Sequence, residues 1–200
     1  MIKQLPHTDS RPLRLGIYGG TFDPVHLGHL ILAGDAREQL RLDAVLFVPC
    51  AQSPHKVGRQ TASARDRLAM LRAAVRGIPS FWISRCEIDR PAPSYAIDTA
   101  TEIREAFPRA ELFWLIGADQ LPKLTTWERY RELKRLVTFA VLERGDGAKR
   151  LPSGVIRLPE PRRVDISASE VRARAKRKLP LIPLVPAPVA AYIQRQNLYY

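Results

Sequence analysis

The sequence predicts one doubly wound α/β domain, a parallel sheet covered by helices on both faces, with a helical segment at its C-terminal end. Short apolar runs alternate along the chain with segments of helical periodicity, which is typical of parallel strands joined by helices. Several of these runs are apolar throughout, as expected for strands that are buried on both faces. The 200 residues are enough for one substantial core, and no internal repeat or low-complexity linker divides them.

The first half of the chain contains three predicted strands and three predicted helices. The apolar runs that predict strands cover residues 13–18, 44–49 and 81–84. The segments with helical spacing cover about residues 27–40, 63–76 and 97–107. In the second of these helices, Leu68, Leu71 and Val75 lie on one face, which we expect to pack on the sheet.

The second half continues the alternation and ends in helices. Strands are predicted at residues 111–117 and 138–143, with a weaker one at 154–158. A helix over 127–136 is predicted between the first two, because Thr125 followed by Glu128 has the spacing of a capping box. Two more helices are predicted at 168–177 and 189–196, separated by the proline-rich 179–188. We interpret residues 1–12 as a loose N-terminal leader and 13–200 as the domain.

Composition restricts the class of protein without identifying it. Hydrophobic residues make up 46% of the chain and charged residues 26%, as in ordinary soluble globular proteins. No apolar run approaches the ~20 residues that cross a bilayer, so no membrane association is expected, and the first residues lack the apolar core of a secretory signal. Two cysteines, Cys50 and Cys86, imply no disulfide framework, so the cytoplasm is the expected location. The net charge of +12 suits nucleic acids, anionic membranes and phosphorylated small molecules alike.

The densest turn chemistry lies between the first predicted strand and the first helix, in GIYGGTFDPVHLGHL, residues 16–30. Doubly wound folds bind ligands at the carboxyl ends of their strands, which is where this stretch falls. Gly19 and Gly20 allow the backbone to approach a ligand without an intervening Cβ. A helix that begins near His26 directs N–H groups and the positive end of its dipole towards the same place, which suits phosphate. His26 and His29 share one helix face, where two imidazoles can donate to phosphate oxygens.

Other interpretations of this stretch are weaker. Glycines at a strand–helix junction are often turn residues only. Two other phosphate-binding motifs are excluded, because neither the Gly-x-Gly-x-x-Gly fingerprint nor the Gly-x-x-x-x-Gly-Lys-Ser/Thr loop is present. A metal site at His26 and His29 is disfavoured because no Cys or acidic partner stands at zinc spacing, and we predict no metal site. Phosphate binding is the favoured interpretation.

Two motifs at opposite ends of the chain resemble one enzyme superfamily. GGTFDPVHLGH, residues 19–29, is similar to the signature of nucleotidyltransferases that carry a His-x-x-His pair in this turn. ISASEVR, residues 166–172, resembles their second signature, Ile-Ser-Ser/Thr-x-x-x-Arg, with Ala168 in place of a hydroxyl residue. Ser167 and Glu170 also have capping-box spacing, which offers a purely structural reason for this motif.

The middle of the chain narrows the resemblance to the bacterial nicotinate mononucleotide adenylyltransferases. The segments that carry it are VPCAQSPHK (48–56), PSYAIDT (93–99), LIGADQLPKLTTW (115–127) and VLERG (141–145). The likeness runs from about residue 14 to the closing LVPAPVAAYIQRQNLY. It implies a Rossmann-like domain that transfers AMP from ATP to nicotinate mononucleotide, giving deamido-NAD and pyrophosphate in NAD biosynthesis. Mg²⁺ is expected to enter with ATP.

The resemblance implies an ATP site built from both motifs. His26 and His29 would hold the phosphates and stabilise the transition state at the α-phosphate, while Arg172 would grip the departing pyrophosphate. The other residues implied in ATP binding are Gly19, Gly20, Thr21, Phe22, Gly117, Asp119, Ile166, Ser167 and Ser169. Asp119 would accept from ribose hydroxyls, the alternative being that it caps the next helix. The nucleophile would be the acceptor's own ionised phosphate, so no general base is expected.

The resemblance also implies an acceptor site. Trp127 would stack on the pyridine ring, the alternative being a core tryptophan at a helix start. Backbone N–H groups near Ala96 and Glu128 would receive the nicotinate carboxylate, and Ala96 stands where the family usually has a hydroxyl residue. The other residues assigned to the acceptor are His55, Lys56, Tyr95, Thr99 and Arg144. His55 and Lys56 also fit an ordinary exposed loop.

Two alternatives to this function stay open at the level of sequence. One is a relative that acts on nicotinamide mononucleotide or phosphopantetheine, although phosphopantetheine enzymes are generally shorter and lack the SYxxxT and GADxLxxLxxW segments. The other is a basic nucleic-acid-binding module of the same fold. Against it stand the intact histidines and Arg172, together with the lack of aromatic residues interleaved with basic ones, so no nucleic-acid partner is expected. The sequence leaves assembly into a homo-oligomer open.

Overall fold

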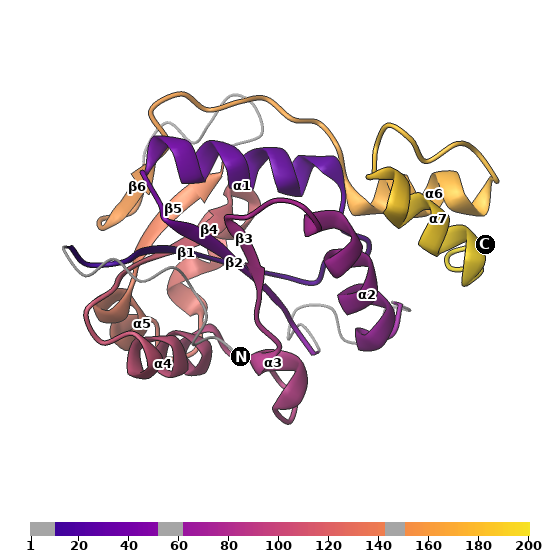
Figure 1. The fold of residues 1–200 in the computed structure, drawn as a ribbon. Coiled ribbons are helices and arrows are strands. Elements are labelled where there is room, and N and C mark those ends of the chain that lie inside the picture. The colour runs from indigo at the N-terminus through magenta and orange to yellow at the C-terminus, as the bar shows by residue number, and fades with distance from the viewer. Residues whose placement is uncertain (1–10, 52–61, 143–150) are drawn as a thin grey trace.

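The computed structural model describes residues 11–51, 62–142 and 151–200 of the chain. Within these ranges, six parallel strands form one sheet in the order β3-β2-β1-β4-β5-β6 (Figure 1). They are β1 Arg14–Gly20, β2 Ala44–Pro49, β3 Phe81–Ile83, β4 Glu111–Gly117, β5 Thr138–Leu142 and β6 Val155–Arg157. The order reverses at the central pair, where β1 lies beside β4. The predicted doubly wound sheet is confirmed, and its switch point lies at the carboxyl ends of β1 and β4.

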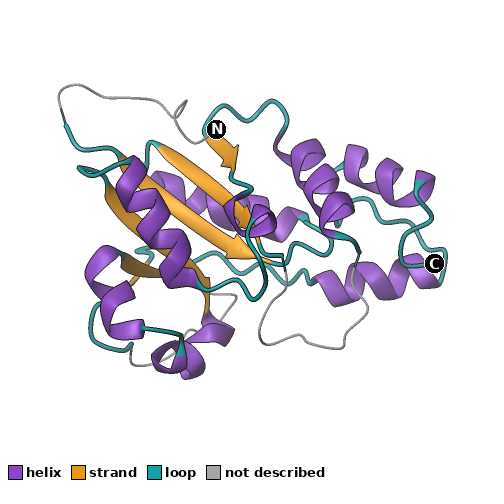
Figure 2. Cartoon of the chain, turned by 90° about the horizontal axis from the view of Figure 1, so that it is seen from below, coloured by secondary structure: helices purple, strands orange, loops and turns teal. Residues whose placement is uncertain are grey.

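Helices cover both faces of the sheet (Figures 1 and 2). On one face lie α1 Leu27–Gln39 and α2 Ala64–Val75, and on the other α3 Cys86–Asp89, α4 Ala96–Ala106 and α5 Tyr130–Leu136. Successive strand residues alternate between the two faces: Tyr18 packs on the α1 side and Ile17 on the α4 side. Each face of the sheet therefore has its own buried cluster.

The C-terminal helices stand beside the sheet, next to α1 and α2 (Figure 1). They are α6 Ala168–Lys176 and α7 Ala187–Arg195, and the apolar sides of both join the core that contains α1 and α2. The hydroxyl of Tyr192 on α7 donates to Asp66 on α2 at 2.9 Å. The predicted C-terminal helical segment is confirmed and is part of the same hydrophobic core.

One predicted element is wrong in its start. The helix expected over 127–136 begins at Tyr130, and residues Ala118–Thr126 form a 3₁₀ helix, η3, which was not predicted, nor was the short α3. The expected capping box of Thr125 and Glu128 does not cap α5, because the residue before that helix is Arg129, in a left-handed conformation with φ of 48°. Arg129 bonds Glu132 in the first turn instead (2.6 and 3.1 Å).

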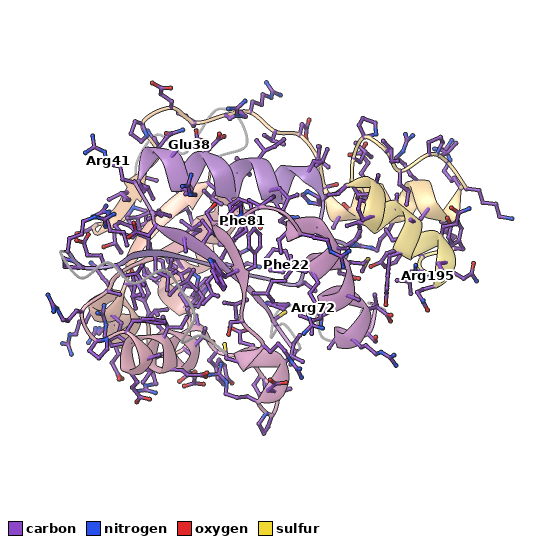
Figure 3. All side chains as sticks on the ribbon, in the orientation of Figure 1. Phe22, Glu38, Arg41, Arg72, Phe81 and Arg195 are labelled. Carbon is purple, nitrogen blue, oxygen red and sulfur yellow. The ribbon has the colours of Figure 1, made fainter. Side chains whose placement is uncertain are left out.

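The periphery is charged and the interior is hydrophobic. The labelled residues Glu38, Arg41, Arg72 and Arg195 lie at the surface, whereas Phe81 lies inside (Figure 3). Of the predicted leader, residues 1–10 lie outside the described residues, and Arg11 pairs with Asp43 (2.5 and 2.9 Å). In the described ranges, every helix is too short or too polar to span a bilayer.

Candidate active site

The two histidines of the first motif lie at the start of α1, directly beyond the carboxyl end of β1. His26 is the N-terminal cap, with φ −138° and ψ 169°, and His29 lies in the first turn. Their rings stack with centroids 3.7 Å apart and planes inclined by 28°. The backbone N–H of His26 donates to Nδ1 of His29 at 3.2 Å, so the proton of neutral His29 is on Nε2. The predicted helix start and shared face are confirmed.

A buried aromatic ring supports His29 from the strand side. Phe22 is 2% exposed, its ring lies inside the molecule (Figure 3), and its centroid is 5.1 Å from that of His29 at 69°. The backbone of Phe22 is left-handed, with φ of 49°, which costs about 1–2 kcal/mol in a non-glycine residue. Contacts with Tyr18 and Phe47, at 5.6 Å each, hold the ring in place. The side chain of Phe22 therefore positions an imidazole.

The glycine between the two histidines leaves room for the His26 ring. A Cβ on Gly28 would lie 3.0 Å from Nδ1 and 3.1 Å from Cε1 of that ring, closer than ordinary van der Waals contact. It would also lie 3.3 Å from a methyl carbon of Val164, in the segment before α6. Gly28 thus lets His26 fold over the first turn of α1 while the C-terminal part of the chain packs against it.

The helix start offers fewer N–H groups to a ligand than expected. The N–H of Leu27 donates to the carbonyl of Leu184 at 2.9 Å, and the N–H of His26 is taken by His29. The C-terminal segment thus reaches α1 and uses one of the donors that the sequence suggested for phosphate.

The second motif lies against the first. Arg172 on α6 donates from Nη1 to the backbone carbonyl of Asp23 at 2.6 Å, although the two residues are 149 positions apart. Ser167 caps α6, since its Oγ accepts the N–H of Glu170 at 3.1 Å, and it lies 3.0 Å from Oγ of Ser169. The capping role of Ser167 is confirmed, and the structure brings both motifs to one site. Ile166 packs on the core beside them.

Asp23 is a buried residue of the first motif that our sequence analysis assigned no role. It is 4% exposed, and Oδ1 of its carboxylate accepts the N–H of Ala62 at 3.1 Å and the hydroxyl of Tyr199 at 2.6 Å. Burial and this bond to Asp23 raise the pKa of Tyr199 far above its usual range, so the phenol stays a donor. Tyr199 was not predicted either, because no local pattern links it to residue 23.

Arg67 on α2 is the second buried charge that was missed. It is 2% exposed and donates to three backbone carbonyls: those of Thr21 (2.8 Å), Ala51 (3.0 Å) and Ala62 (3.2 Å). The half-buried Thr21, expected at the ATP site, thus has its carbonyl turned to Arg67. One feature of the sequence could have indicated its burial: Arg67 directly precedes Leu68, which lies on the apolar face of the helix predicted over 63–76.

On the other side of the switch point, Asp119 follows β4. It is exposed, lies in the first turn of η3, and accepts from the side-chain amide of Gln120 at 2.7 Å. Its carboxylate lies directly over Gly117, where a Cβ would overlap it. Gly117 is the N-terminal cap of η3, so the alternative that Asp119 caps this helix is wrong. Its carboxylate therefore has no capping role in η3.

Trp127 packs against the core that contains α4 and α5. It is half-buried at the end of η3, and its ring stands edge-on to Trp114 (6.3 Å) and Phe139 (6.2 Å). Its Nε1 is buried without a hydrogen-bond partner among the described residues. The alternative of a core tryptophan at a helix start is wrong in its position, because Trp127 ends one helix and α5 begins three residues later.

The residues assigned to the carboxylate lie at the start of α4 and just after η3. Tyr95 is the N-terminal cap of α4, Ala96 is its first residue, and an ion pair of 3.8 Å between Arg129 and Asp98 joins the two segments. The N–H groups of Ala96 and Glu128 donate to no other described residue. Two backbone donors are therefore available where a carboxylate was expected.

Thr99 does not fit the direct contact expected of it. Its side chain is fully buried (0% exposed), its hydroxyl donates to Glu87 at 2.7 Å, and it accepts from Arg90 at 2.7 Å. Glu87 is itself 5% exposed, and its burial raises its pKa. Thr99 is therefore part of a buried polar cluster at α4, in which Glu87 and Arg90 engage its hydroxyl.

Three assigned residues, His55, Lys56 and Arg144, lie outside the described residues. In the described ranges, no three His, Cys, Asp or Glu side chains gather as ligands for a metal ion. Cys50 and Cys86 are both buried, and neither forms a disulfide.

Comparisons with known proteins agree with these two motifs. The sequence pattern of the cytidylyltransferase-like family matches residues 17–174. A probable nicotinate-nucleotide adenylyltransferase of Methylacidiphilum infernorum is 44% identical over 189 residues, 93% of this chain and 92% of that protein. One of Opitutus terrae is 45% identical over 191 residues, 94% of this chain and 98% of that protein.

Solved structures share the fold. The nicotinic acid mononucleotide adenylyltransferase of Plasmodium falciparum, complexed with NaAD, superposes with a TM-score of 0.77. The match covers 94% of this chain and 97% of that one at 18% identity. The same protein complexed with APC gives 0.76 over the same shares at 19% identity. At these identities the likeness establishes the architecture alone.

Proposed function

This chain belongs to the family of nicotinate-nucleotide adenylyltransferases, within the wider cytidylyltransferase-like family, and from that premise we propose that it transfers AMP from ATP to nicotinate mononucleotide. The products are deamido-NAD and pyrophosphate, the adenylyl-transfer step of NAD biosynthesis. The observation that carries the proposal is the hydrogen bond from Arg172 to Asp23, which holds the second motif against the loop that presents the stacked histidines.

The reaction requires positioning more than acid–base chemistry. A phosphate oxygen of nicotinate mononucleotide attacks the α-phosphorus of ATP, and the bond from that phosphorus to the oxygen shared with the β-phosphate breaks. The attacking phosphate is already ionised at neutral pH, so no proton has to be removed, and pyrophosphate leaves as an anion. Catalysis of this kind is achieved by aligning the two phosphates and stabilising the charge that spreads over the equatorial oxygens.

The positive groups of the site suit that charge. His26 and His29 stand at the positive end of the α1 dipole, where their N–H groups donate to the α-phosphate. Arg172, with Ser167 and Ser169 at the start of α6, takes the β- and γ-phosphates and stays with the departing pyrophosphate. Asp119 accepts from the ribose hydroxyls at the end of β4.

Magnesium enters as part of the substrate. ATP arrives as its Mg²⁺ complex, and this ion prefers phosphate and water oxygens to an all-protein cage. Asp23 is 4% exposed and its Oδ1 already accepts two hydrogen bonds, from Ala62 and Tyr199, which makes its carboxylate a poor ligand for the ion. The residues of the site therefore bind the triphosphate, and the triphosphate binds the ion.

The acceptor fits between α4 and the end of η3. The pyridine ring stacks on Trp127, whose orientation is fixed by Trp114 and Phe139. The carboxylate accepts from the N–H groups of Ala96 and Glu128, with Tyr95 beside them. Two N–H donors bind a carboxylate more strongly than a carboxamide, because hydrogen bonds to an ionised acceptor are stronger than those to a neutral one.

The proposed partners are the two small-molecule substrates, in the cytoplasm and without a nucleic-acid or membrane partner. The cytoplasmic location stays a prediction from the sequence, and assembly into a homo-oligomer stays open.

The test measures pyrophosphate release with MgATP and three acceptors in parallel: nicotinate mononucleotide, nicotinamide mononucleotide and phosphopantetheine. We expect the first to be preferred at least about tenfold in kcat/KM over the second, the effect of one charge-assisted hydrogen bond. A Trp127→Ala variant should raise the KM for the acceptor and leave the KM for ATP unchanged. Preference for either other acceptor would overturn the assignment of Trp127 and Ala96 while leaving the phosphate chemistry in place.

A further inference from the structure

Arg67 is a buried cation whose bonds all go to backbone of the loops at the site. It projects from α2, and its guanidinium donates to the carbonyl of Thr21 through Nη1, of Ala51 through Nη2 and of Ala62 through Nε. These carbonyls belong to three different segments. Thr21 follows β1, Ala51 follows β2, and Ala62 precedes α2. One side chain therefore fixes the spacing of the loops that leave two neighbouring strands.

A buried anion completes this arrangement from the opposite side. Asp23 accepts the N–H of Ala62 at 3.1 Å, while Arg67 takes the carbonyl of the same residue at 3.2 Å. The backbone of Ala62 is thus held between two side chains of opposite charge, each less than 5% exposed. Asp23 also accepts from Tyr199, and its carbonyl accepts from Arg172. Charge-assisted bonds of this kind are stronger than neutral ones, so we expect the loops to be held rigidly.

We propose that Arg67 is a positioning residue for the transfer reaction, which sets the separation between the ATP-binding loop after β1 and the backbone at Ala51 and Ala62. It touches neither reacting phosphate in this role. It acts through the carbonyl of Thr21, five residues before His26, and through the two residues that flank the stretch with His55 and Lys56 in the sequence. The inference rests on the proposed function, since alignment matters where two bound phosphates must meet in line.

The geometry requires an arginine rather than any cation. A guanidinium presents its donors in a planar fork, and here two arms and the Nε face three separate carbonyls. A lysine keeps the buried charge and most of the volume, but its ammonium is a single point at the end of a flexible stem. Arg67→Lys therefore separates the effect of the bonds from the effect of the charge.

The experiment compares wild type, Arg67→Lys and Arg72→Lys, the last an exposed arginine on the same helix (Figure 3). The affinities for MgATP and for nicotinate mononucleotide are measured separately by calorimetry, and kcat by pyrophosphate release. We expect Arg67→Lys to lower kcat about tenfold or more while each affinity stays within about threefold, because misplacement by a fraction of an ångström is felt in the transition state. Arg72→Lys should match wild type in all three quantities.

A second variant separates the loss of positioning from a general folding defect. Tyr199→Phe removes one hydroxyl from Asp23 and keeps the ring, so we expect a smaller loss of kcat, about threefold, again without a change in either affinity. Unchanged kcat in both variants, or weakened affinities with unchanged kcat, would overturn the positioning role. A wild type that releases no pyrophosphate from nicotinate mononucleotide would overturn the proposed function instead.

Discussion

Replacement of Gly28 by alanine tests whether the placement of the His26 ring limits the rate. The new Cβ would lie 3.0 Å from Nδ1 and 3.3 Å from the Val164 methyl, so the imidazole must move by a few tenths of an ångström. A displacement of about 1 Å in a reacting group costs about 10²-fold, so this smaller shift should lower kcat by about three- to tenfold. The same change replaces a helical glycine by alanine, which favours the folded helix by about 0.5–1 kcal/mol.

The assay pairs kcat from pyrophosphate release with the melting temperature from calorimetry. Gly34→Ala is the matched control, because Gly34 lies on the same helix and a Cβ there would meet nothing within 4 Å. For a chain of this size, 0.5–1 kcal/mol corresponds to roughly 1–4 °C. We expect Gly34→Ala to melt higher by about that amount with unchanged kcat, and Gly28→Ala to lose activity without losing stability.

Two outcomes would refute this reasoning. If Gly28→Ala keeps full activity, a shift of the His26 ring by a few tenths of an ångström does not affect the rate. That result would contradict the role of this ring at the α-phosphate. If the variant melts several degrees lower than wild type, the added methyl group has disturbed packing against Val164, and the loss of activity would no longer report on the imidazole.

Two further predictions concern the start of α6 and the buried acid below α4. Ser167→Ala should cost about 1 kcal/mol of stability by removing the cap of α6 and should raise the KM for ATP, whereas Ser169→Ala should raise that KM without the loss of stability. Burial raises the pKa of Glu87 in the folded protein. At pH values above the ordinary pKa of glutamate, the folded state therefore binds more protons than the unfolded state. The stability that this group contributes is lost as the pH rises through the folded-state pKa. The melting temperature of Glu87→Gln relative to wild type should therefore increase from pH 4 to 8, and a constant difference would contradict the raised pKa.

The strands and most helices could be predicted from the sequence because their signals are local. Buried parallel strands are continuous apolar runs, and α2, α4 and α6 begin and end within a few residues of the predicted positions. The histidine pair was also predictable, since spacing on one helix turn places both rings together. The start of α5 was not. Thr125 and Glu128 match a capping box, but η3 and the left-handed Arg129 take that stretch of backbone.

The residues that were missed have partners far away in the sequence. Arg67 reaches Thr21 across 46 positions and Tyr199 reaches Asp23 across 176. No spacing rule connects such pairs. From sequence alone an arginine or aspartate is expected at the surface, and only the fold shows that carbonyl or amide groups surround it in the interior. Thr99 shows a different difficulty. Its position in a family motif suggested substrate contact, while the fold uses its hydroxyl to satisfy Glu87.

The bond between Tyr199 and Asp23 has a consequence for how the protein is made. Translation produces the loop after β1 early, whereas its partner Tyr199 and the carbonyl of Leu184, which takes the first N–H of α1, are added 176 and about 160 residues later. A nascent chain can therefore pair β1 with β2 and β4 on the ribosome before it can assemble the nucleotide site. We expect catalytic competence to appear only after Tyr199 has been synthesised and its contact with Asp23 can close.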